Sequence, residues 1–342
     1  MQSLLNRRKK KVFKLQVAAL VLILPSILLL SSISSAGSRT QSVAVIKSGC
    51  RKFIGRVSSS GDLHLPSGSR LCQGDRINPV KGATVKVLCY LNGNFVYLKH
   101  STVFKEPDTC TVPQEIAELC TGLNPSNCYN PKGAGEEKEE APTLISPYGS
   151  SMLSTRPQIS WSAVSNATNY TVIVKGYEFY WEATVDQKTT TLAYPKEQIE
   201  LQLGNTYKIT VIANRGGSLI SSEPLVISVL PEKDQKEIAY KVKQINELNL
   251  PPDEAAFLDL DAVFMSKSLL NESIETLKAR VAAGSQNPTL YRVLADRYLE
   301  AWLPNEALRN YQVANELAKR TRNSDELARV QEGLKLVEWH NR

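Results

Sequence analysis

The sequence predicts a multidomain protein that joins two β modules to a C-terminal all-α domain. Six cysteines lie within 79 residues of one another and none lies elsewhere, which indicates a β domain with disulfides. Residues 143–230 carry short runs of β-branched and aromatic residues at close spacing, the pattern of a β-sandwich. Residues 254–321 repeat one apolar spacing with a period of 34 residues, which is typical of stacked helical hairpins.

Residues 1–36 have the features of an export signal. Six lysines and arginines, with no acid, precede the apolar run Val17–Leu30 and the small residues Ser34-Ser35-Ala36. This order predicts a signal peptide cleaved after Ala36. The alternative is an inner-membrane anchor over residues 12–33, because the apolar stretch approaches the shortest bilayer span, about 17 residues. Both interpretations place residues 38–342 in the periplasm or cell envelope.

The distribution of charge argues against a nucleic-acid partner. The net charge is +7, but residues 1–36 supply +6 of it, so the remainder carries only +1. A nearly neutral body lacks the basic surface that phosphate backbones require. Membrane association is expected only through the N-terminal segment.

Residues 38–130 form the predicted cysteine-rich β domain. Strands are expected at 43–46, 83–91 and 95–98, and Asn92-Gly93 predicts a hairpin turn because both positions tolerate positive φ. The disulfide candidates are Cys50, Cys72, Cys89, Cys110, Cys120 and Cys128. Their pairing stays open. A metal site is the weaker alternative, since the cysteines include no Cys-x-x-Cys pair and only His64 and His100 lie nearby.

Short sequence motifs in this domain resemble those of a known family. Gly55-Arg56-Val57, the phrase 71–77 (LCQGDRI) and the strand that ends in Asn92-Gly93 resemble the FecR-like periplasmic β domain. The resemblance implies envelope signalling or a surface protein, and no catalytic residue carries over from it. The acidic, glycine- and proline-containing residues 131–142 cannot bury apolar surface and are expected to form a linker.

Residues 143–230 form the second β module. Trp161, followed by Ala167-x-x-Tyr170, and Leu203-Gly204-x-x-Tyr207 resemble the fibronectin type III fold. The resemblance implies that Trp161 packs in the core and Tyr207 holds a corner. A further cluster consists of Tyr177, Phe179, Tyr180 and Trp181. It is interpreted as a partly covered strand or domain contact, with a sugar-binding platform as the alternative.

Residues 232–342 form the predicted helical domain. Apolar spacing predicts a helix from about Asp234 and a capping helix over 324–339, with Asp253 as the N-cap of the helix after Pro251-Pro252. Two units, 254–287 and 288–321, lie between. Large and small residues recur in them at Phe257, Leu260, Asp261, Phe264, Ser273, Leu277 and Arg280, and at Tyr291, Leu294, Ala295, Tyr298, Ala307, Tyr311 and Ala314.

This pattern resembles the tetratricopeptide repeat family, although Asp261 and Arg280 occupy positions that the family keeps small. The resemblance implies a partner-binding groove along the first helix of each unit. Its positions here are Leu258, Ala262, Met265, Arg292, Asp296, Leu299 and Glu300. Such a mixture of apolar and charged side chains suits a protein or peptide partner. The alternative is that Leu258 and Met265 pack on the helix at 234–249.

The sequence contains no motif for catalysis. It has no phosphate-binding glycine-rich loop, no His-Glu-x-x-His and no nucleophile elbow. We therefore expect no enzyme activity, no cofactor and no metal. The expected function is an exported envelope scaffold that binds a protein or peptide through its helical repeats. The alternative is an envelope glycan binder or sensor that acts through the β modules.

Overall fold

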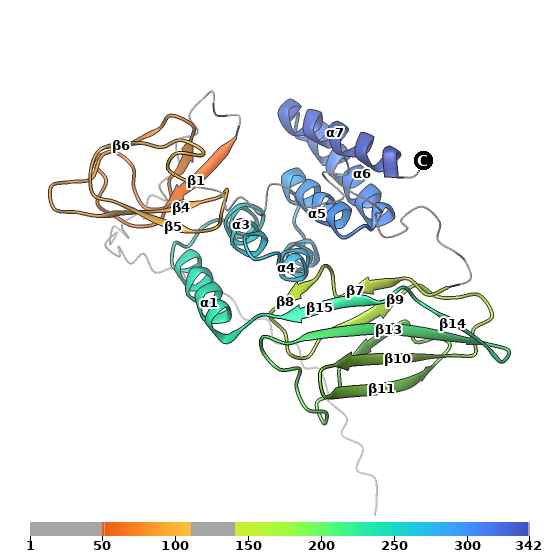
Figure 1. Ribbon diagram of the computed structural model, residues 1–342. Coiled ribbons are helices and arrows are strands. Elements are labelled where there is room, and N and C mark those ends of the chain that lie inside the picture. Colours follow the sequence, from red (N-terminus) through yellow and green to blue (C-terminus); the bar gives the residue numbers. More distant parts are fainter. Residues whose placement is uncertain (1–49, 51, 111–140, 341–342) are drawn as a thin grey trace, which may run out of the picture. The chain divides into compact units, whose positions relative to one another are not determined.

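The computed structural model describes residues 50, 52–110 and 141–340, all of which lie in one unit of the chain, 44–342 (Figure 1). The predicted export segment, the strand at 43–46, Cys120, Cys128 and most of the linker lie outside these residues. Within the described part, none of the helices combines the length and apolar character needed to cross a membrane.

The first β module contains a four-stranded antiparallel sheet in the order β2-β1-β4-β5 and a separate β3–β6 pair. The strands are β1 Phe53–Val57, β2 Arg70–Cys72, β3 Arg76–Ile77, β4 Val85–Cys89, β5 Phe95–Leu98 and β6 Thr102–Val103. All five residues of β4 are buried, so this strand forms the centre of the module.

The predicted hairpin between β4 and β5 forms, but its turn differs from the expected one. The backbone pair Cys89–Asn94 closes a loop of four residues, 90–93, and the Gly93 N–H donates to the Cys89 carbonyl at 2.9 Å. Only Gly93 has a positive φ, 61°. Asn92 instead accepts a hydrogen bond from the Asn94 N–H through its side chain, so the asparagine shapes the turn without adopting the left-handed conformation.

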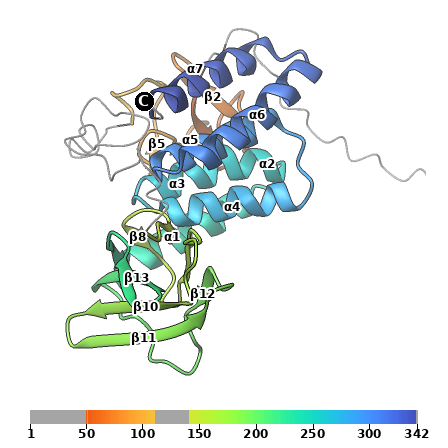
Figure 2. The same ribbon diagram turned by 90° about the vertical axis from the view of Figure 1, so that its right-hand side faces the viewer.

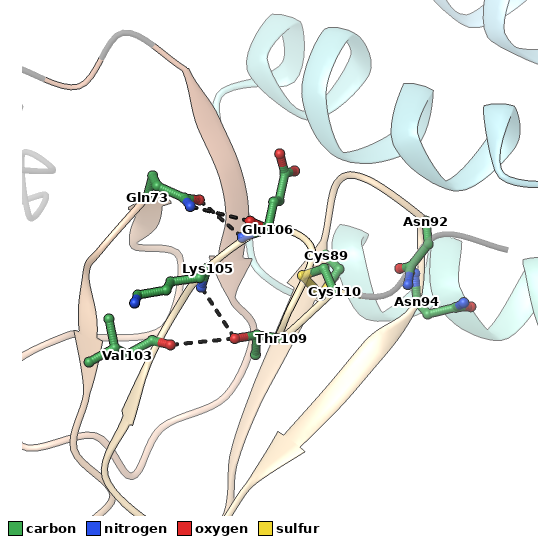
Figure 3. Close-up of a disulfide and its surroundings, with 9 residues drawn as sticks. All are labelled: Gln73, Cys89, Asn92, Asn94, Val103, Lys105, Glu106, Thr109 and Cys110. Carbon is green, nitrogen blue, oxygen red and sulfur yellow. Dashed lines mark hydrogen bonds between the residues drawn. A yellow bond between two sulfur atoms is a disulfide. The ribbon is translucent and has the colours of Figure 1, made fainter. Parts of the chain in front are cut away.

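Two disulfides, Cys50–Cys72 and Cys89–Cys110, confirm the disulfide prediction for four of the six cysteines. Figure 3 shows Cys89–Cys110, which ties β4 to the segment after β6. Nearby, the Glu106 N–H donates to Gln73 Oε1 at 3.0 Å, and Gln73 Nε2 donates back to the Glu106 carbonyl. These four cysteines are therefore structural and do not serve as metal ligands.

The second module is a β-sandwich, as predicted. One sheet has the order β12-β9-β7, and the other has the order β11-β10-β13-β15-β8, with β14 paired to β13 (Figures 1 and 2). The strands are β7 Leu144–Ser146, β8 Ser151–Met152, β9 Gln158–Trp161, β10 Asn169–Gly176, β11 Phe179–Asp186, β12 Thr191–Ala193, β13 Thr206–Arg215, β14 Ser218–Ser221 and β15 Leu225–Val229.

Alternation along the strands builds the core of the sandwich. In β10 and β13 every second residue is buried, because successive side chains of a strand point to opposite faces. Trp161 packs in this core against Tyr170, with ring centroids 5.5 Å apart. The Tyr207 hydroxyl accepts a hydrogen bond from the Gln202 N–H at 2.7 Å, which confirms its corner role.

The C-terminal region is all-α. Its elements are α1 Glu232–Asn246, α2 Pro252–Glu254, the π-helical turn η3 Ala255–Leu260, α3 Asp261–Met265, α4 Leu270–Ala282, α5 Pro288–Glu300, α6 Pro304–Arg320 and α7 Ser324–His340. Helices α4, α5, α6 and α7 pack in succession (Figures 1 and 2). The predicted first and last helices form within three residues of their expected bounds.

Small residues allow close helix packing, as the repeat pattern predicted. Ala295 in α5 and Ala307 and Ala314 in α6 are completely buried. In α7, a Cβ on Gly333 would clash with the Tyr311 ring. Glycine at this position therefore leaves the space that the tyrosine ring occupies.

The first unit departs from a regular α-helix. Six of its residues, 255–260, form a π-helical turn, a feature often found at functional sites. Asp253 does not act as the predicted N-cap, because the helix already begins at Pro252. Its carboxylate instead accepts from Arg280 Nε at 2.8 Å and from the Ser285 hydroxyl at 2.7 Å, which accounts for the arginine at a position expected to be small.

Candidate partner-binding face

The predicted groove lies on the first helix of each helical unit. Leu258 belongs to η3, Ala262 and Met265 belong to α3, and the other four positions lie on α5. All except Leu299 are partly exposed.

Leu299 is wrong as a groove residue, because it is completely buried in the helical core. It follows the buried Ala295 by four positions, so both side chains share the inward face of α5. Its contribution is to the stability of the helical domain.

The alternative packing on α1 is also wrong for Met265. This side chain packs against the core formed by α4 to α7. The residues that cluster with α1 are different ones, Ala255, Leu260, Val263 and Phe264. Leu258 belongs to neither core cluster and is partly exposed on η3.

Ion pairs cross the groove from α3 to α5 and from α5 to α7. Arg297 donates to both carboxylate oxygens of Asp261, at 2.7 Å each, and the Ser273 hydroxyl donates to the same carboxylate at 2.6 Å. Arg292 pairs with Glu326 of α7. The acid at position 261, unusual for the repeat pattern, is thus the partner of an arginine in the next unit.

Two further carboxylates complete this charged row. Asp296 accepts from Arg292 Nη1 at 2.6 Å and from the Tyr311 hydroxyl, and Glu300 accepts from Arg297. Burial raises the pKa of Asp296, and the Arg292 charge opposes that shift. Burial likewise raises the pKa of Glu300, opposed by Arg297. These carboxylates are held in low-dielectric surroundings where an added cation would interact strongly.

The row has an excess of negative charge. It contains four carboxylates, from Asp261, Asp296, Glu300 and Glu326, and two guanidinium groups, from Arg292 and Arg297. Its internal pairs fix the side chains before any ligand arrives, which lowers the ordering cost of binding. Chemically, the face suits a segment that brings both positive charge and apolar contacts for Leu258 and Met265.

The first β module docks on the same helix, beside the groove. Arg56 of β1 is 1% exposed and donates from Nε to Asp259 at 2.7 Å, and Asp259 is completely buried. A second nitrogen of Arg56 donates to Glu254 at 2.7 Å, and a third donates to the Gly68 carbonyl. The guanidinium group is therefore fully engaged between the β module and the helical domain.

The β4–β5 loop extends this contact. The Tyr90 hydroxyl donates to Asp259 at 3.0 Å. A Cβ on Gly93 would lie 2.6 Å from the Ala262 carbonyl oxygen and 2.7 Å from the Ser266 hydroxyl. The groove at Ala262 is thus bordered by a loop of the same chain.

Helix α1 also contacts the same hairpin. Lys86 of β4 lies over the Phe95 ring, 4.0 Å from its centroid, and donates to the Tyr240 hydroxyl at 3.1 Å. Lys241 of α1 donates to the Asn94 side chain at 2.7 Å. Leu88 of β4 joins the apolar cluster that contains Ile238 and Ile245 of α1.

The sandwich also contacts the helical domain. Glu272 of α4 accepts from the Leu153 N–H at 2.7 Å. Tyr148 and Tyr298 of α5 stack edge-to-face, with ring centroids 5.9 Å apart. Both β modules therefore pack on helices of one domain. Sequence reasoning missed Arg56, Asp259 and Glu272. A charged residue within an otherwise apolar segment was the only signal for Arg56 and Asp259, and Glu272 had no such signal.

The aromatic cluster of the sandwich divides into two pairs. Trp181 is buried against Tyr194, and Phe179 packs edge-to-face on Tyr207. Tyr177 and Tyr180 are 83% and 61% exposed. The covered-strand interpretation is confirmed for Phe179 and Trp181, whereas Tyr177 and Tyr180 are exposed to solvent.

No family model and no curated protein matches the chain. Among solved structures, the FN1–FN3 domains of chicken CNTN1 are similar at 17% identity over 27% of this chain and 31% of that chain, with a TM-score of 0.23. This chain thus spans about a third of that structure. An FN3 domain of human collagen XX is similar at 15% identity over 30% of this chain and all of the other, with a TM-score of 0.23.

Two fibronectin type III domains of chicken tenascin are similar at 15% identity over 47% of this chain and 66% of that chain, with a TM-score of 0.18. At these TM-scores the likeness carries no argument. The fold of residues 143–230 rests instead on its own three-stranded and six-stranded sheets and on the Tyr207 corner.

Proposed function

We propose that the chain is an exported, non-enzymatic envelope scaffold whose helical domain binds a protein or peptide partner along the predicted groove. The observation that carries the proposal is the fixed row of largely buried charges across α3, α5 and α7, next to a helix face that already holds a module of the same chain. The helices belong in this proposal to a tetratricopeptide-like array, and residues 38–130 to a FecR-like domain.

The compartment supports this proposal. Two disulfides indicate an oxidising environment outside the cytosol. The finer assignment, to the periplasm or cell envelope, rests on the export signal of residues 1–36.

The charge of the groove defines the kind of partner. Because carboxylates outnumber guanidinium groups, a segment with lysine or arginine beside apolar residues is favoured over an acidic one. Leu258 and Met265 would supply the apolar contacts at one end of the row, and Asp296 and Glu300 would attract the basic side chains.

Affinity capture from envelope extracts tests this proposal with the full chain as bait. Leu258→Glu alters the groove, and Val313→Glu alters an apolar side chain on α6 that is 41% exposed. A partner retained by the wild type and by Val313→Glu, but lost from Leu258→Glu at unchanged melting temperature, is the expected result. Equal retention by both variants would refute binding at the groove.

A further inference from the structure

A row of four exposed side chains crosses the outer face of the larger sheet of the sandwich. In the register of the strands, Lys175 of β10 lies opposite Tyr180 of β11 and Lys208 of β13, and Lys208 lies opposite Val226 of β15. All four side chains are exposed. The row therefore presents two adjacent ammonium groups flanked by an aromatic ring and an aliphatic side chain.

The two lysines lack a compensating charge. Within the residues that the structure describes, neither ammonium group forms an ion pair with a carboxylate. The nearest acid along β11 is Glu182, which accepts a hydrogen bond from the Tyr180 hydroxyl and lies opposite Ile173, the next outward position from Lys175 on β10. Like charges directly opposite each other destabilise a sheet, so folding alone does not account for this pair.

The tip of the same hairpin adds a second aromatic side chain. Tyr177 lies in the turn between β10 and β11 and is 83% exposed, the largest fraction among the large hydrophobic side chains of the described residues. An aromatic ring has an apolar face that packs on the C–H face of a pyranose, while a phenol hydroxyl bonds to its oxygens. Two lysines beside two tyrosines combine cation donors with stacking surfaces.

We infer that this face, defined by Lys175, Tyr177, Tyr180 and Lys208, binds an acidic polysaccharide whose sugar carboxylates pair with the two lysines. Charge complementarity is the argument for this occupant. An extended row across neighbouring strands matches successive rings of a glycan chain, and the lysines supply the positive charge that a uronate needs. The site is separate from the groove on the helices and does not depend on the scaffold proposal.

Titration calorimetry with sodium polygalacturonate tests the inference on the full chain with its disulfides intact. Dextran serves as the neutral glycan, and phosphatidylglycerol vesicles serve as the anionic lipid. The test variant is Lys175→Gln with Lys208→Gln. The matched control is Lys188→Gln with Lys196→Gln, which removes the same charge from exposed positions elsewhere in the sandwich.

The wild type is expected to bind polygalacturonate and not dextran, with an affinity that falls as salt is raised. The test variant should bind at least about tenfold more weakly, a loss of about 1.4 kcal/mol of binding free energy. Its melting temperature should be no lower than that of the wild type, because the substitutions remove the like-charge pair. The control should bind as the wild type does. Tyr177→Ala with Tyr180→Ala should also weaken binding.

Three results would overturn the inference. The first is no binding of polygalacturonate by the wild type, and the second is an equal loss in the test and control variants. The third is tighter binding to phosphatidylglycerol vesicles than to polygalacturonate, which would assign the lysine pair to a lipid surface.

Discussion

Arg56 of β1 and Asp259 of the π-helical turn form a completely buried ion pair, with Nε and Oδ1 2.7 Å apart across 203 residues of sequence. Burial raises the pKa of Asp259, and the Arg56 charge opposes this rise. Asp259 Oδ2 has no hydrogen-bond partner in the described structure. Burying either charge alone would destabilise the fold, and each residue compensates the charge of the other. The pair also connects the first β module to the helical domain.

Removing one member of this pair should destabilise the protein strongly. Arg56→Met leaves an uncompensated buried carboxylate and is expected to cost about 3–5 kcal/mol of the free energy of unfolding. Adding Asp259→Leu should restore part of that loss, because no buried charge then remains. Urea unfolding of the wild type, both single variants and the double variant measures the coupling. Strictly additive costs would show that the two residues do not interact.

Gly93→Ala should loosen the contact between the β4–β5 loop and α3. The alanine would have to adopt the left-handed backbone conformation, at a φ of 61°. Its Cβ would lie 2.6 Å from the Ala262 carbonyl oxygen. Gly82→Ala is the matched control, since Gly82 has a φ of 80° and open space around it. Both variants should lose about 1–3 kcal/mol through strain, and Gly93→Ala should lose more. Equal melting temperatures in the two variants would contradict the close approach.

Glu272→Gln should stabilise the protein at neutral pH but not in acid. Burial raises the pKa of Glu272, opposed by the Leu153 N–H. A carboxyl with a raised folded-state pKa contributes stability below its unfolded-state pKa, about 4.3, and loses it as the pH rises through the folded-state value. Glutamine keeps the acceptor for Leu153 and removes the charge.

The melting temperature of Glu272→Gln should accordingly exceed that of the wild type at about pH 8, and the difference should vanish below about pH 4. Calorimetry across this range provides the measurement. A variant less stable than the wild type at high pH would mean that the charged form of Glu272 is the favoured one.

The protein isolated without reductant should contain no free thiol. The structure pairs four cysteines, and we expect Cys120 and Cys128 to be oxidised as well. Thiol titration in denaturant without reductant should detect almost none, whereas six thiols would contradict the prediction. Reduction should lower the melting temperature, because each bridge contributes about 2–4 kcal/mol.

Local patterns predicted much of the fold. Helical spacing predicted α1 and α7, strand alternation predicted the sandwich, and the small residue at Ala295 predicted a helix contact. Each of these signals comes from residues that are close together in the sequence. Arg56 and Asp259 carry no such signal, since nothing near either residue identifies a partner 203 positions away. Leu299 shows the limit of a repeat template, because it lies four positions after the buried Ala295 and shares the inward face of α5 with it.

Site-specific photo-cross-linking in the producing cell tests the central claim, that the helical groove binds a protein. A photoreactive amino acid replaces Met265 in the groove or, as the control, Val313 on the exposed surface of α6. The account predicts a discrete protein adduct from position 265 that disappears when Leu258→Glu is added, and no such adduct from position 313. An adduct from position 313 alone, or none from position 265 in a folded chain, would contradict it.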